Sequence, residues 1–583
     1  MEYNALVEVY EALDSTSKRL EKTHIISEFL KKVPKEDIAT IMLLLEGRLF
    51  PRWDSRELGV ASRLVIKAIS SATGIEAEKV EKEWKKAGDL GNVAENLIKG
   101  KKQATLFSSS LSVRKVFSNL QKLATLEGHG SVDKKIGLIS ELLTSATPKE
   151  AKYITRTLLQ DMRIGVGEGS LRDAIVWAFF GDKVKIAYNV EENDIQIEDR
   201  EEYNKYVGAV QKAYDATNDF GPVAEAAKSG LKALEKMELS VGIPIKVMLA
   251  LKVDNAKEGL ERVGKPAEAE YKYDGFRIQA HKKGNDVKLF TRKLEDVTMQ
   301  FPEAVSAIKK NIKAKEAILD SEAVGYSKAS GKYLPFQSIS QRIKRKYDIE
   351  KMASDFPVEV NVFDIIYYDG KSFLDEPFEE RKKVLKKIVS EEKKRIVLAK
   401  SITTSDEKEI ENFYNEAIEK GNEGLMLKKL DAPYRPGARV GYMVKYKKYR
   451  ETFDLAVVGA EWGEGKRTKW LSSYIIACAG EDGELLEVGR VSTGLKEKDE
   501  EGLSFNEMTK ILKPLVISEK GKEARIKPKI IIEVGYEEIQ KSPTYSSGYA
   551  LRFPRVICLR EEKSLSEITT LEQVEEAYGG QKK

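Results

Sequence analysis

Residues 270–277 read EYKYDGFR and predict a β-strand with aromatic rings on one face and charges on the other. Successive side chains of a strand point to opposite sides of its sheet, so Tyr271 and Tyr273 share one face. The opposite face carries Glu270, Lys272 and Asp274. A lysine between two acids most often forms a solvent-facing ion pair. The same surroundings can make it a nucleophile, because burial lowers the pKa of an amine and a neighbouring base accepts its proton.

The segments that follow add groups suited to a nucleoside triphosphate. Gly275 would let a phosphate approach the backbone, and Phe363 offers a flat face for a base. Glu322 is an acid inside an apolar strand, a costly position unless it is paired or bound to a metal ion. The other charged candidates are Arg277, Arg292, Glu423, Lys445 and Lys447. Singly, each is better explained as a surface charge or a core aromatic. Together they supply a nucleophile, cations for phosphates, carboxylates for Mg²⁺ and a stacking platform.

The composition of the whole chain indicates a globular protein of several domains. Its 583 residues exceed what one hydrophobic core accommodates, and 41% of them are hydrophobic. No apolar run approaches the ~20 residues of a membrane span, and the acidic N-terminus is no secretory signal. Two cysteines and three histidines are too few for a zinc module or a disulfide framework. We therefore expect a cytoplasmic protein that makes no membrane contact.

The net charge of +5 is small, because 99 Lys and Arg oppose 94 Asp and Glu. A site for a polyanion must therefore come from local clusters of cations rather than from the field of the whole molecule. Charged residues make up 33% of the chain, which fits a heat-adapted protein with many surface ion pairs. An ordinary solvated surface explains this composition equally well.

The secondary structure that the sequence predicts changes three times along the chain. Residues 1–220 predict helices, among them one that starts at Thr147–Glu150 (TPKE) with a cap, a first-turn proline and a glutamate that reaches back. Residues 221–243 predict a polar helix followed by a linker, and 244–448 mix strands with helices. Residues 449–583 contain short strands and glycine turns, which suit a small β-barrel. We find no internal repeat of about 20–50 residues.

Six segments of the middle region resemble, in order and approximate spacing, the nucleotidyltransferase motifs of ATP-dependent DNA ligases. They are KYDG (272–275) with Arg277, TRKLED (291–296), LDSEAVG (319–325), FDI (363–365), EGLMLK (423–428) and VKYKK (444–448). The likeness is to the archaeal replicative type and covers nearly the whole chain. It implies an all-α N-terminal DNA-binding domain, an α+β adenylation domain and a C-terminal OB-fold barrel.

The resemblance also implies roles for single residues. Lys272 would attack the α-phosphate of ATP and become lysyl-AMP, while Glu270 and Phe363 hold the adenine. Arg277, Arg292 and Glu322 would contact sugar and phosphates, and Glu322 and Glu423 would lie near Mg²⁺ or Mn²⁺. Further phosphate contacts would come from Arg439, Lys445 and Lys447. Met443 stands where the family often has an aromatic residue. The AMP would then activate a 5′-phosphate at a nick in double-stranded DNA, and the adjacent 3′-hydroxyl would seal it.

The flanking regions carry further candidates that the resemblance implies. Arg552 and Arg555, in RFPR, would orient pyrophosphate. Backbone contacts to DNA would come from Gly128, Gly130, Ser131, Lys134, Lys135, Arg163, Gly165 and Gly167. A glycine-containing connection between helices explains these two loops equally well. The run RIKRK (342–346) is a weaker candidate for the same role. A short motif for a PCNA-like sliding clamp would use Gln103, Leu106 and Phe107. We expect a monomer.

Three alternatives compete with a DNA ligase of replication, repair and recombination. An RNA ligase or a capping-type nucleotidyltransferase shares K-x-D-G, but capping enzymes end in R-x-D-K rather than RFPR. NAD-dependent ligases carry a four-cysteine zinc module that two cysteines cannot form. A non-catalytic, clamp-associated nucleic-acid-binding protein has no physical need for so many costly, partly buried charges.

Overall fold

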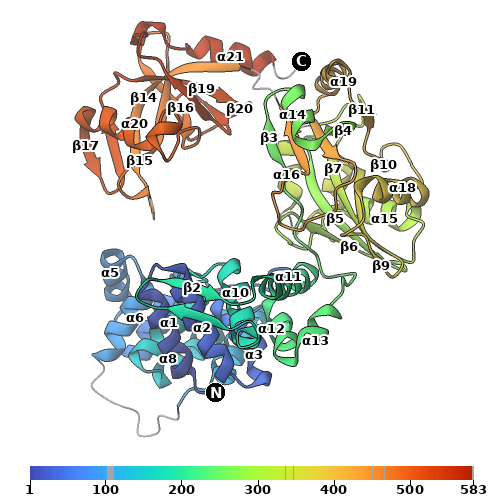
Figure 1. Ribbon diagram of the computed structural model, residues 1–583. Coiled ribbons are helices and arrows are strands. Elements are labelled where there is room, and N and C mark those ends of the chain that lie inside the picture. Colours follow the sequence, from blue (N-terminus) through green and yellow to red (C-terminus); the bar gives the residue numbers. More distant parts are fainter. Residues whose placement is uncertain are drawn as a thin grey trace. The chain divides into compact units, whose positions relative to one another are not determined.

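The computed structural model describes residues 1–100, 110–334, 336–343, 345, 347–447, 451–464 and 467–580. Gln103, Leu106 and Phe107 of the predicted clamp motif lie outside these residues. Two compact units, 1–446 and 447–583, make up the chain (Figure 1). The finer domain boundaries at 220, 243 and 448 stay predictions. Within the described residues, no helix is both long enough and apolar enough to cross a membrane.

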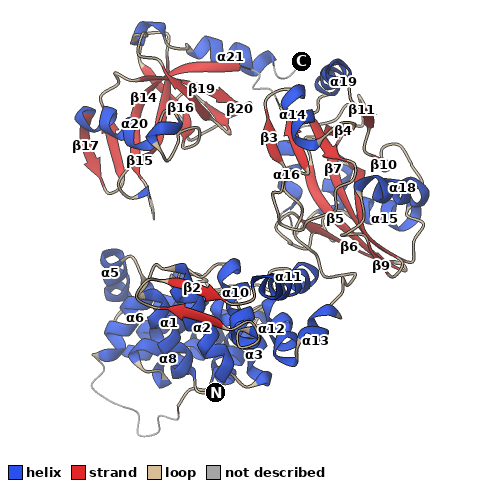
Figure 2. Cartoon of the chain, viewed as in Figure 1, coloured by secondary structure: helices blue, strands red, loops and turns tan. Residues whose placement is uncertain are grey.

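The first part of unit one is built from helices (Figure 2). Thr147 caps one of them as predicted: its hydroxyl accepts from the Glu150 N–H at 3.3 Å, and the Glu150 carboxylate accepts from the Thr147 N–H at 2.7 Å. The helices are α1 (Tyr3–Asp14), α2 (Arg19–Lys32), α3 (Lys35–Leu45), α4 (Ser62–Thr73), α5 (Ala77–Ala87), α6 (Leu90–Lys99), α7 (Val113–Lys122), α8 (Ser131–Ser145), α9 (Pro148–Leu158), α10 (Glu168–Phe180), α11 (Arg200–Thr217), α12 (Phe220–Ser229) and α13 (Leu231–Glu235).

Two observations change the predicted picture of this region. It is not all-α, because β1 (Ile186–Asn189) and β2 (Asp194–Ile197) form an antiparallel hairpin. The hairpin packs alternate side chains against the helical core, and the sequence reading missed it because each strand has only four residues. Residues 221–243, predicted as a polar helix and a linker, include most of α12, but this helix buries Val223, Ala224 and Ala227 in the same core.

Two β-sheets follow in the second part of unit one. The five-stranded sheet has the order β11-β4-β12-β13-β3, and the six-stranded sheet has the order β10-β8-β7-β5-β6 with β9 beside β8. The strands are β3 (Leu251–Val253), β4 (Ala267–Lys272), β5 (Phe276–Lys283), β6 (Asp286–Thr291), β7 (Glu316–Gly325), β8 (Val358–Tyr368), β9 (Lys371–Ser372), β10 (Ile396–Leu398), β11 (Ser401–Thr404), β12 (Gly424–Lys429) and β13 (Met443–Tyr446). The helices are α14 (Ala256–Val263), α15 (Pro302–Asn311), α16 (Phe336–Ile343), α17 (Ile349–Asp355), α18 (Phe378–Ile388) and α19 (Glu407–Glu419).

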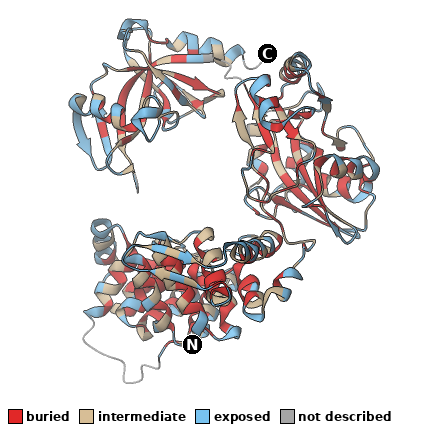
Figure 3. Cartoon of the chain, viewed as in Figure 1, coloured by how far each residue is buried: buried red, intermediate tan, exposed pale blue. Residues whose placement is uncertain are grey.

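Each sheet has one apolar face and one face rich in charge. Tyr271 and Tyr273 lie in an apolar core with residues of α14 and α19, which confirms the predicted aromatic face. The six-stranded sheet turns its apolar face to α15 and α18. Because strands alternate, the acids and bases of both sheets occupy the two remaining faces. Contacts between these faces, described below, show that they meet; the strands are buried on both sides (Figure 3).

The second unit is strand-rich, and its described strands do not confirm the predicted barrel. Its sheet has the order β16-β15-β14-β18-β17, with β19 pairing both β14 and β22, and no pairing among the described residues joins the two ends. OB-fold closure is therefore not seen. The elements are β14 (Glu451–Trp462), β15 (Leu471–Ala479), β16 (Leu485–Val491), α20 (Phe505–Leu512), β17 (Val516–Lys520), β18 (Glu523–Ile526), β19 (Ile531–Tyr536), β20 (Glu538–Lys541), β21 (Tyr549–Arg552), β22 (Arg555–Leu559) and α21 (Leu571–Gly580).

Candidate active site

Lys272 ends β4 beside a carboxylate that the next strand delivers. β12 pairs antiparallel with β4 so that Lys272 lies opposite Gly424, and the Glu423 N–H donates to the Lys272 carbonyl at 2.8 Å. The Lys272 ammonium forms a close ion pair with Glu423 Oε2, and the two side chains are 23% and 21% exposed. The lysine is therefore in an ion pair, as its surroundings favoured, but one that solvent reaches.

Glu322 completes what we call the reactive corner, defined as Lys272, Glu322 and Glu423. Burial of its carboxyl raises the pKa of Glu322 to about 8, although the charges of Lys272 and Arg277 oppose the rise. A second carboxylate, Glu423, adds to the rise because two like charges disfavour ionisation. Two carboxylates with one shared lysine suit a divalent cation that also takes phosphate oxygens. The described residues contain no cluster of three or more side chains that would hold a metal by themselves.

Arg277, predicted to contact sugar or phosphate, is held by the protein itself. Its guanidinium donates to both Asp320 oxygens, at 2.8 Å from Nε, and to the Met248 carbonyl at 3.1 Å. Tyr434 contacts both Arg277 and Asp320, the latter at 2.7 Å. Burial lowers the pKa of Arg277, but the Asp320 charge outweighs it and raises the pKa above its usual range. Asp320 precedes Glu322 by two residues, so strand alternation alone places both on one face.

Phe363 owes its position to an irregularity in β8. Ser321 of β7 pairs with Val362 and Asp320 pairs with Asp364, so Phe363 is an extra residue in the ladder. Such an insertion turns a side chain out of the regular alternation. The ring lies 5.3 Å from the Arg277 guanidinium carbon and 4.7 Å from the Lys428 ammonium. Arg277, Phe363 and Lys428 line one small pocket together with Tyr434.

Glu270 belongs to a second group of charges, the buried quartet of Glu268, Glu270, Lys382 and Lys428. All four side chains are at most 8% exposed. The Lys382 ammonium donates to Glu270 Oε1 at 2.8 Å and to Glu268, and Lys428 pairs with Glu270 Oε2. Burial favours a higher pKa for Glu268, but the Lys382 charge prevails and holds it below its usual value. Sequence reasoning missed Lys382, because it lies on α18, far from β4 in the chain.

The remaining phosphate-binding candidates divide between the two units. Lys445 lies on the sheet face that carries Glu270 and Lys272, because β13 pairs it with Met426 and β4 pairs Met426 with Glu270. Arg292 and Arg439 are exposed in the same unit. Lys447 belongs to the second unit, where its ammonium donates to Glu537 at 2.8 Å.

The two RFPR arginines also belong to the second unit. Arg552 donates to Glu538 at 2.9 Å, and Arg555 is exposed. Between them, Phe553 has a φ of +50° and is 62% exposed.

Gly275 is explained by packing rather than by a phosphate. A Cβ at this position would lie 2.4 Å from the Ala323 carbonyl oxygen and 3.0 Å from Glu322 Cγ. Any side chain would therefore push β5 away from β7 or displace Glu322. The glycine expected to admit a ligand instead admits the neighbouring strand.

The first predicted DNA loop keeps four of its five residues at the surface. Gly128 and Gly130 adopt φ of +80° and +75° before α8 begins at Ser131, and Lys134 is exposed. Lys135 is a correction: it is buried, and its ammonium donates to the Leu58 carbonyl at 2.6 Å. One residue along a helix rotates a side chain by about 100°, which separates these adjacent lysines.

The second loop, 161–167, is tied down in the same way. Lys22, also buried, donates to the Ile164 carbonyl, and Gly165 has a φ of +60°. Arg163 is exposed but donates to Asp161 at 2.8 Å and to the Gly88 carbonyl at 3.0 Å, and Gly167 caps α10.

The run RIKRK offers less to DNA than expected. Arg342 is buried and donates to Glu303 at 2.6 Å. Lys344 and Lys346 lie outside the described residues.

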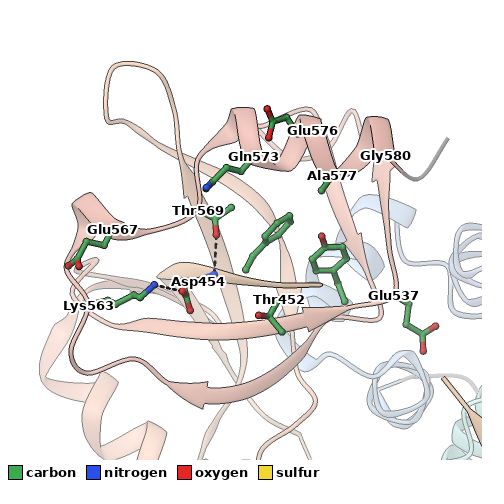
Figure 4. A pocket seen from close by; sticks show the side chains of 12 residues that line it. Thr452, Asp454, Glu537, Lys563, Glu567, Thr569, Gln573, Glu576, Ala577 and Gly580 are labelled. Carbon is green, nitrogen blue, oxygen red and sulfur yellow. Dashed lines mark hydrogen bonds and ion pairs between the residues drawn. The ribbon is translucent and has the colours of Figure 1, made fainter. Parts of the chain in front are cut away.

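A separate cavity of about 640 Å³ lies in the second unit (Figure 4). Its polar lining includes Asp454, Glu537, Glu567 and Glu576, with Lys563 bound to Asp454 at 2.6 Å. This mostly acidic lining would repel a phosphate, so a nucleotide fits the reactive corner better than this cavity.

Comparisons with known proteins agree with the geometry. Residues 247–447 match the family described as "ATP dependent DNA ligase domain", which spans both sheets. Residues 2–176 match "DNA ligase N terminus", and 467–563 match "ATP dependent DNA ligase C terminal region". The three matches together take in the reactive corner, the predicted DNA loops and the RFPR segment.

Curated relatives match over their full length. A DNA ligase of Nanoarchaeum equitans is 47% identical over 99% of this chain and 98% of its own. A DNA ligase of Archaeoglobus fulgidus is 42% identical over 99% of this chain and 98% of its own. A solved structure described as Pmar-Lig_PreS3 shares the fold, with a TM-score of 0.55 and 18% identity over 95% of this chain and 99% of that one. The chain belongs to the ATP-dependent DNA ligases.

Proposed function

We infer that this protein seals nicks in double-stranded DNA at the expense of ATP. The observation that carries the inference is the place of Lys272: an amine at the edge of solvent, between two carboxylates, and on the same sheet face as Glu270. RNA ligation or capping and a non-catalytic scaffold are set aside, because ligase-specific N-terminal and C-terminal families match on both sides of this site.

In the first step, Lys272 Nζ bonds to the α-phosphorus of ATP as the bond to pyrophosphate breaks. The amine must lose a proton, and Glu423, which contacts it directly, is the acceptor at hand. Lys445 lies on the same face two strands away and stabilises the growing charge on the phosphate. A 5′-phosphate oxygen at the nick then displaces the lysine from AMP. The 3′-hydroxyl oxygen finally attacks that 5′-phosphorus, which joins the strands and releases AMP.

Mg²⁺ fits the two carboxylates of the corner. Glu322 and Glu423 would hold it, and the metal would neutralise charge on the phosphates. Burial raises the pKa of the Glu322 carboxyl, and the positive charge of a bound cation would lower it. Mn²⁺ would serve through the same oxygen ligands.

The flanking regions would bind DNA and reagents. We propose backbone contacts from Gly128, Gly130, Ser131, Lys134, Arg163, Gly165 and Gly167, and pyrophosphate contacts from Arg552 and Arg555. The second unit would act as the family's OB-fold. Sliding-clamp binding, the monomeric state and a cytoplasmic, chromosome-associated location stay predictions of the sequence.

The test is transfer of label. Incubation with α-³²P-ATP and Mg²⁺ should give a labelled protein, and nicked DNA should then remove the label as AMP while the nick closes. GTP should label poorly. A protein that never takes up label, or that retains it in the presence of nicked DNA, would overturn the assignment.

A further inference from the structure

Lys382 is a buried lysine whose donors are all used. Its ammonium carries three N–H groups and meets three acceptors: Glu268, Glu270 at 2.8 Å and the Ser401 hydroxyl at 3.2 Å. The next lysine of the same helix, Lys383, stays exposed in a surface pair with Glu380 at 2.6 Å. α18 therefore turns one lysine towards β4 and the next one to solvent.

The carboxylate that Lys382 holds lies beside the aromatic platform. Lys428 Nζ pairs with Glu270 Oε2 and lies 4.7 Å from the centre of the Phe363 ring, so one ammonium bridges the acid and the ring. Glu270 also shares its sheet face with Lys272, two residues on. A purine stacked on Phe363, with its phosphates at Lys272, would turn one edge towards Glu270.

The chemistry of that edge decides which purine is accepted. An ionised carboxylate only accepts hydrogen bonds, so it binds a 6-amino group and repels a 6-oxo group. The Glu270 side chain has several rotatable bonds, and its acceptor atoms discriminate only when they are fixed. Lys382 fixes Oε1 and Lys428 fixes Oε2, and each oxygen can still accept a further bond.

Lys382 and Lys428 differ in what else they touch. Lys428 lies over Phe363 itself, so changing it would disturb the stacking platform and the ion pair with Glu270 together. The hydrogen-bond partners of Lys382 are Glu268, Glu270 and Ser401, none of which is aromatic. The ammonium also lies 5.8 Å from the centre of the Phe378 ring, so its removal alters the orientation of the carboxylate and this second ring rather than Phe363.

We propose that Lys382 is a positioning residue that holds Glu270 against the 6-amino group of the nucleotide and thereby sets the preference for a 6-aminopurine triphosphate. This inference rests on the proposed function, and it adds a determinant of substrate choice on a helix outside the six segments.

The test compares Lys382→Met with Lys383→Met in the full-length protein, using formation of the enzyme–nucleotide adduct as the assay. The two substrates are ATP and purine riboside 5′-triphosphate, which lacks only the amino group. Lys382→Met should raise the KM for ATP about tenfold, the value of one oriented hydrogen bond, with kcat changed less than about twofold. The KM for purine riboside triphosphate should stay the same, and Lys383→Met should change neither.

An equal rise of KM for both nucleotides, or a fall in kcat alone, would overturn the proposal, because a merely structural role cannot distinguish them. Should Lys382→Met fail to fold, Ser401→Ala decides, since it removes one small partner of the same ammonium. The preference for ATP over purine riboside triphosphate should then fall about twofold to threefold, and an unchanged preference rejects the idea. Absence of any adduct in the parent protein would instead reject the proposed function.

Discussion

The reactive corner and the buried quartet both lie at one face of the five-stranded sheet, with Glu322 contributed by β7 and Lys382 by α18, yet they are built differently. In the corner, the Lys272 and Glu423 side chains are 23% and 21% exposed, and one lysine serves two acids. In the quartet, two lysines balance two acids and none of the four is more than 8% exposed. Solvent reaches the first group and is kept from the second.

This difference separates charges that must change partners from charges that must not. The Lys272–Glu423 pair has to open before the amine can react, and partial exposure keeps the cost of opening low. Breaking a buried pair leaves an uncompensated charge in a medium of low polarity, which is strongly destabilising. We therefore expect substitutions in the corner to remove activity and substitutions in the quartet to alter stability and substrate choice.

The largest expected effect is that of Lys272→Ala. Adduct formation should fall by more than about a thousandfold, because the attacking atom itself is lost, while affinity for nicked DNA stays within about twofold. Mass spectrometry after incubation with ATP and Mg²⁺ measures the adduct. Lys283→Ala, which removes an exposed lysine paired with Glu316 at 3.0 Å, is the matched control. If the Lys272→Ala protein were adenylated to the same extent as the parent, Lys272 would not be the nucleophile.

Glu423→Gln should have the next largest effect, about a hundredfold on adduct formation. The variant loses both the contact that receives the proton and one carboxylate for the metal, about 2–3 kcal/mol of barrier. Single-turnover labelling at several Mg²⁺ concentrations should show a weaker metal dependence. Glu419→Gln, an exposed acid at the end of α19, serves as the control. Unchanged labelling would mean that the Lys272–Glu423 ion pair has no role in adduct formation.

Glu268→Gln should leave chemistry nearly intact and lower stability by about 2 kcal/mol at neutral pH, since Lys382 loses one of its two counter-charges. The folded-state pKa of Glu268 lies below its usual value of 4.5. Its stabilisation is therefore complete above about pH 4.5 and disappears as the pH falls through the folded-state pKa. Calorimetry of both proteins should show melting temperatures that differ at pH 7 and converge in acid. A difference in melting temperature that grows as the pH falls would contradict the stabilising role of the ionised Glu268 carboxylate.

The smallest effects are expected at Lys135, a buried lysine whose ammonium donates to a backbone carbonyl rather than to a carboxylate. Lys135 donates to a carbonyl oxygen, so Lys135→Met should change stability by about 1 kcal/mol and leave DNA affinity unchanged. Its exposed neighbour provides the contrast: Lys134→Met should weaken binding to nicked DNA about threefold and reduce the salt dependence of binding. Equal losses of DNA affinity in the two variants would contradict the expectation that Lys134 contacts DNA and Lys135 does not.

Strand alternation predicted the corner better than it predicted the quartet. The pattern of EYKYDGFR alone placed Lys272 opposite the tyrosines, and the tyrosines are in the core. Lys382 escaped notice because its partners come from a different element, and only packing brings α18 to β4. The same limit explains Lys135, whose burial depends on a carbonyl 77 residues away. The predicted barrel is not confirmed: short strands and glycine turns also build an open sheet, and no pairing among the described residues joins the ends of this one.

The extra residue at Phe363 is one of two unpaired residues in β8. β8 carries a second unpaired residue at Ile366, since Leu319 pairs with Ile365 and Ile318 pairs with Tyr367. One insertion inverts inside and outside for everything beyond it, and a second one three positions later restores the original sense. The two ends of β8 thus keep their orientation while a short window between them is reversed. Deleting Phe363 would make Val362 and Asp364 consecutive, still opposite Ser321 and Asp320, so the paired residues would keep their sides and only the platform would be lost.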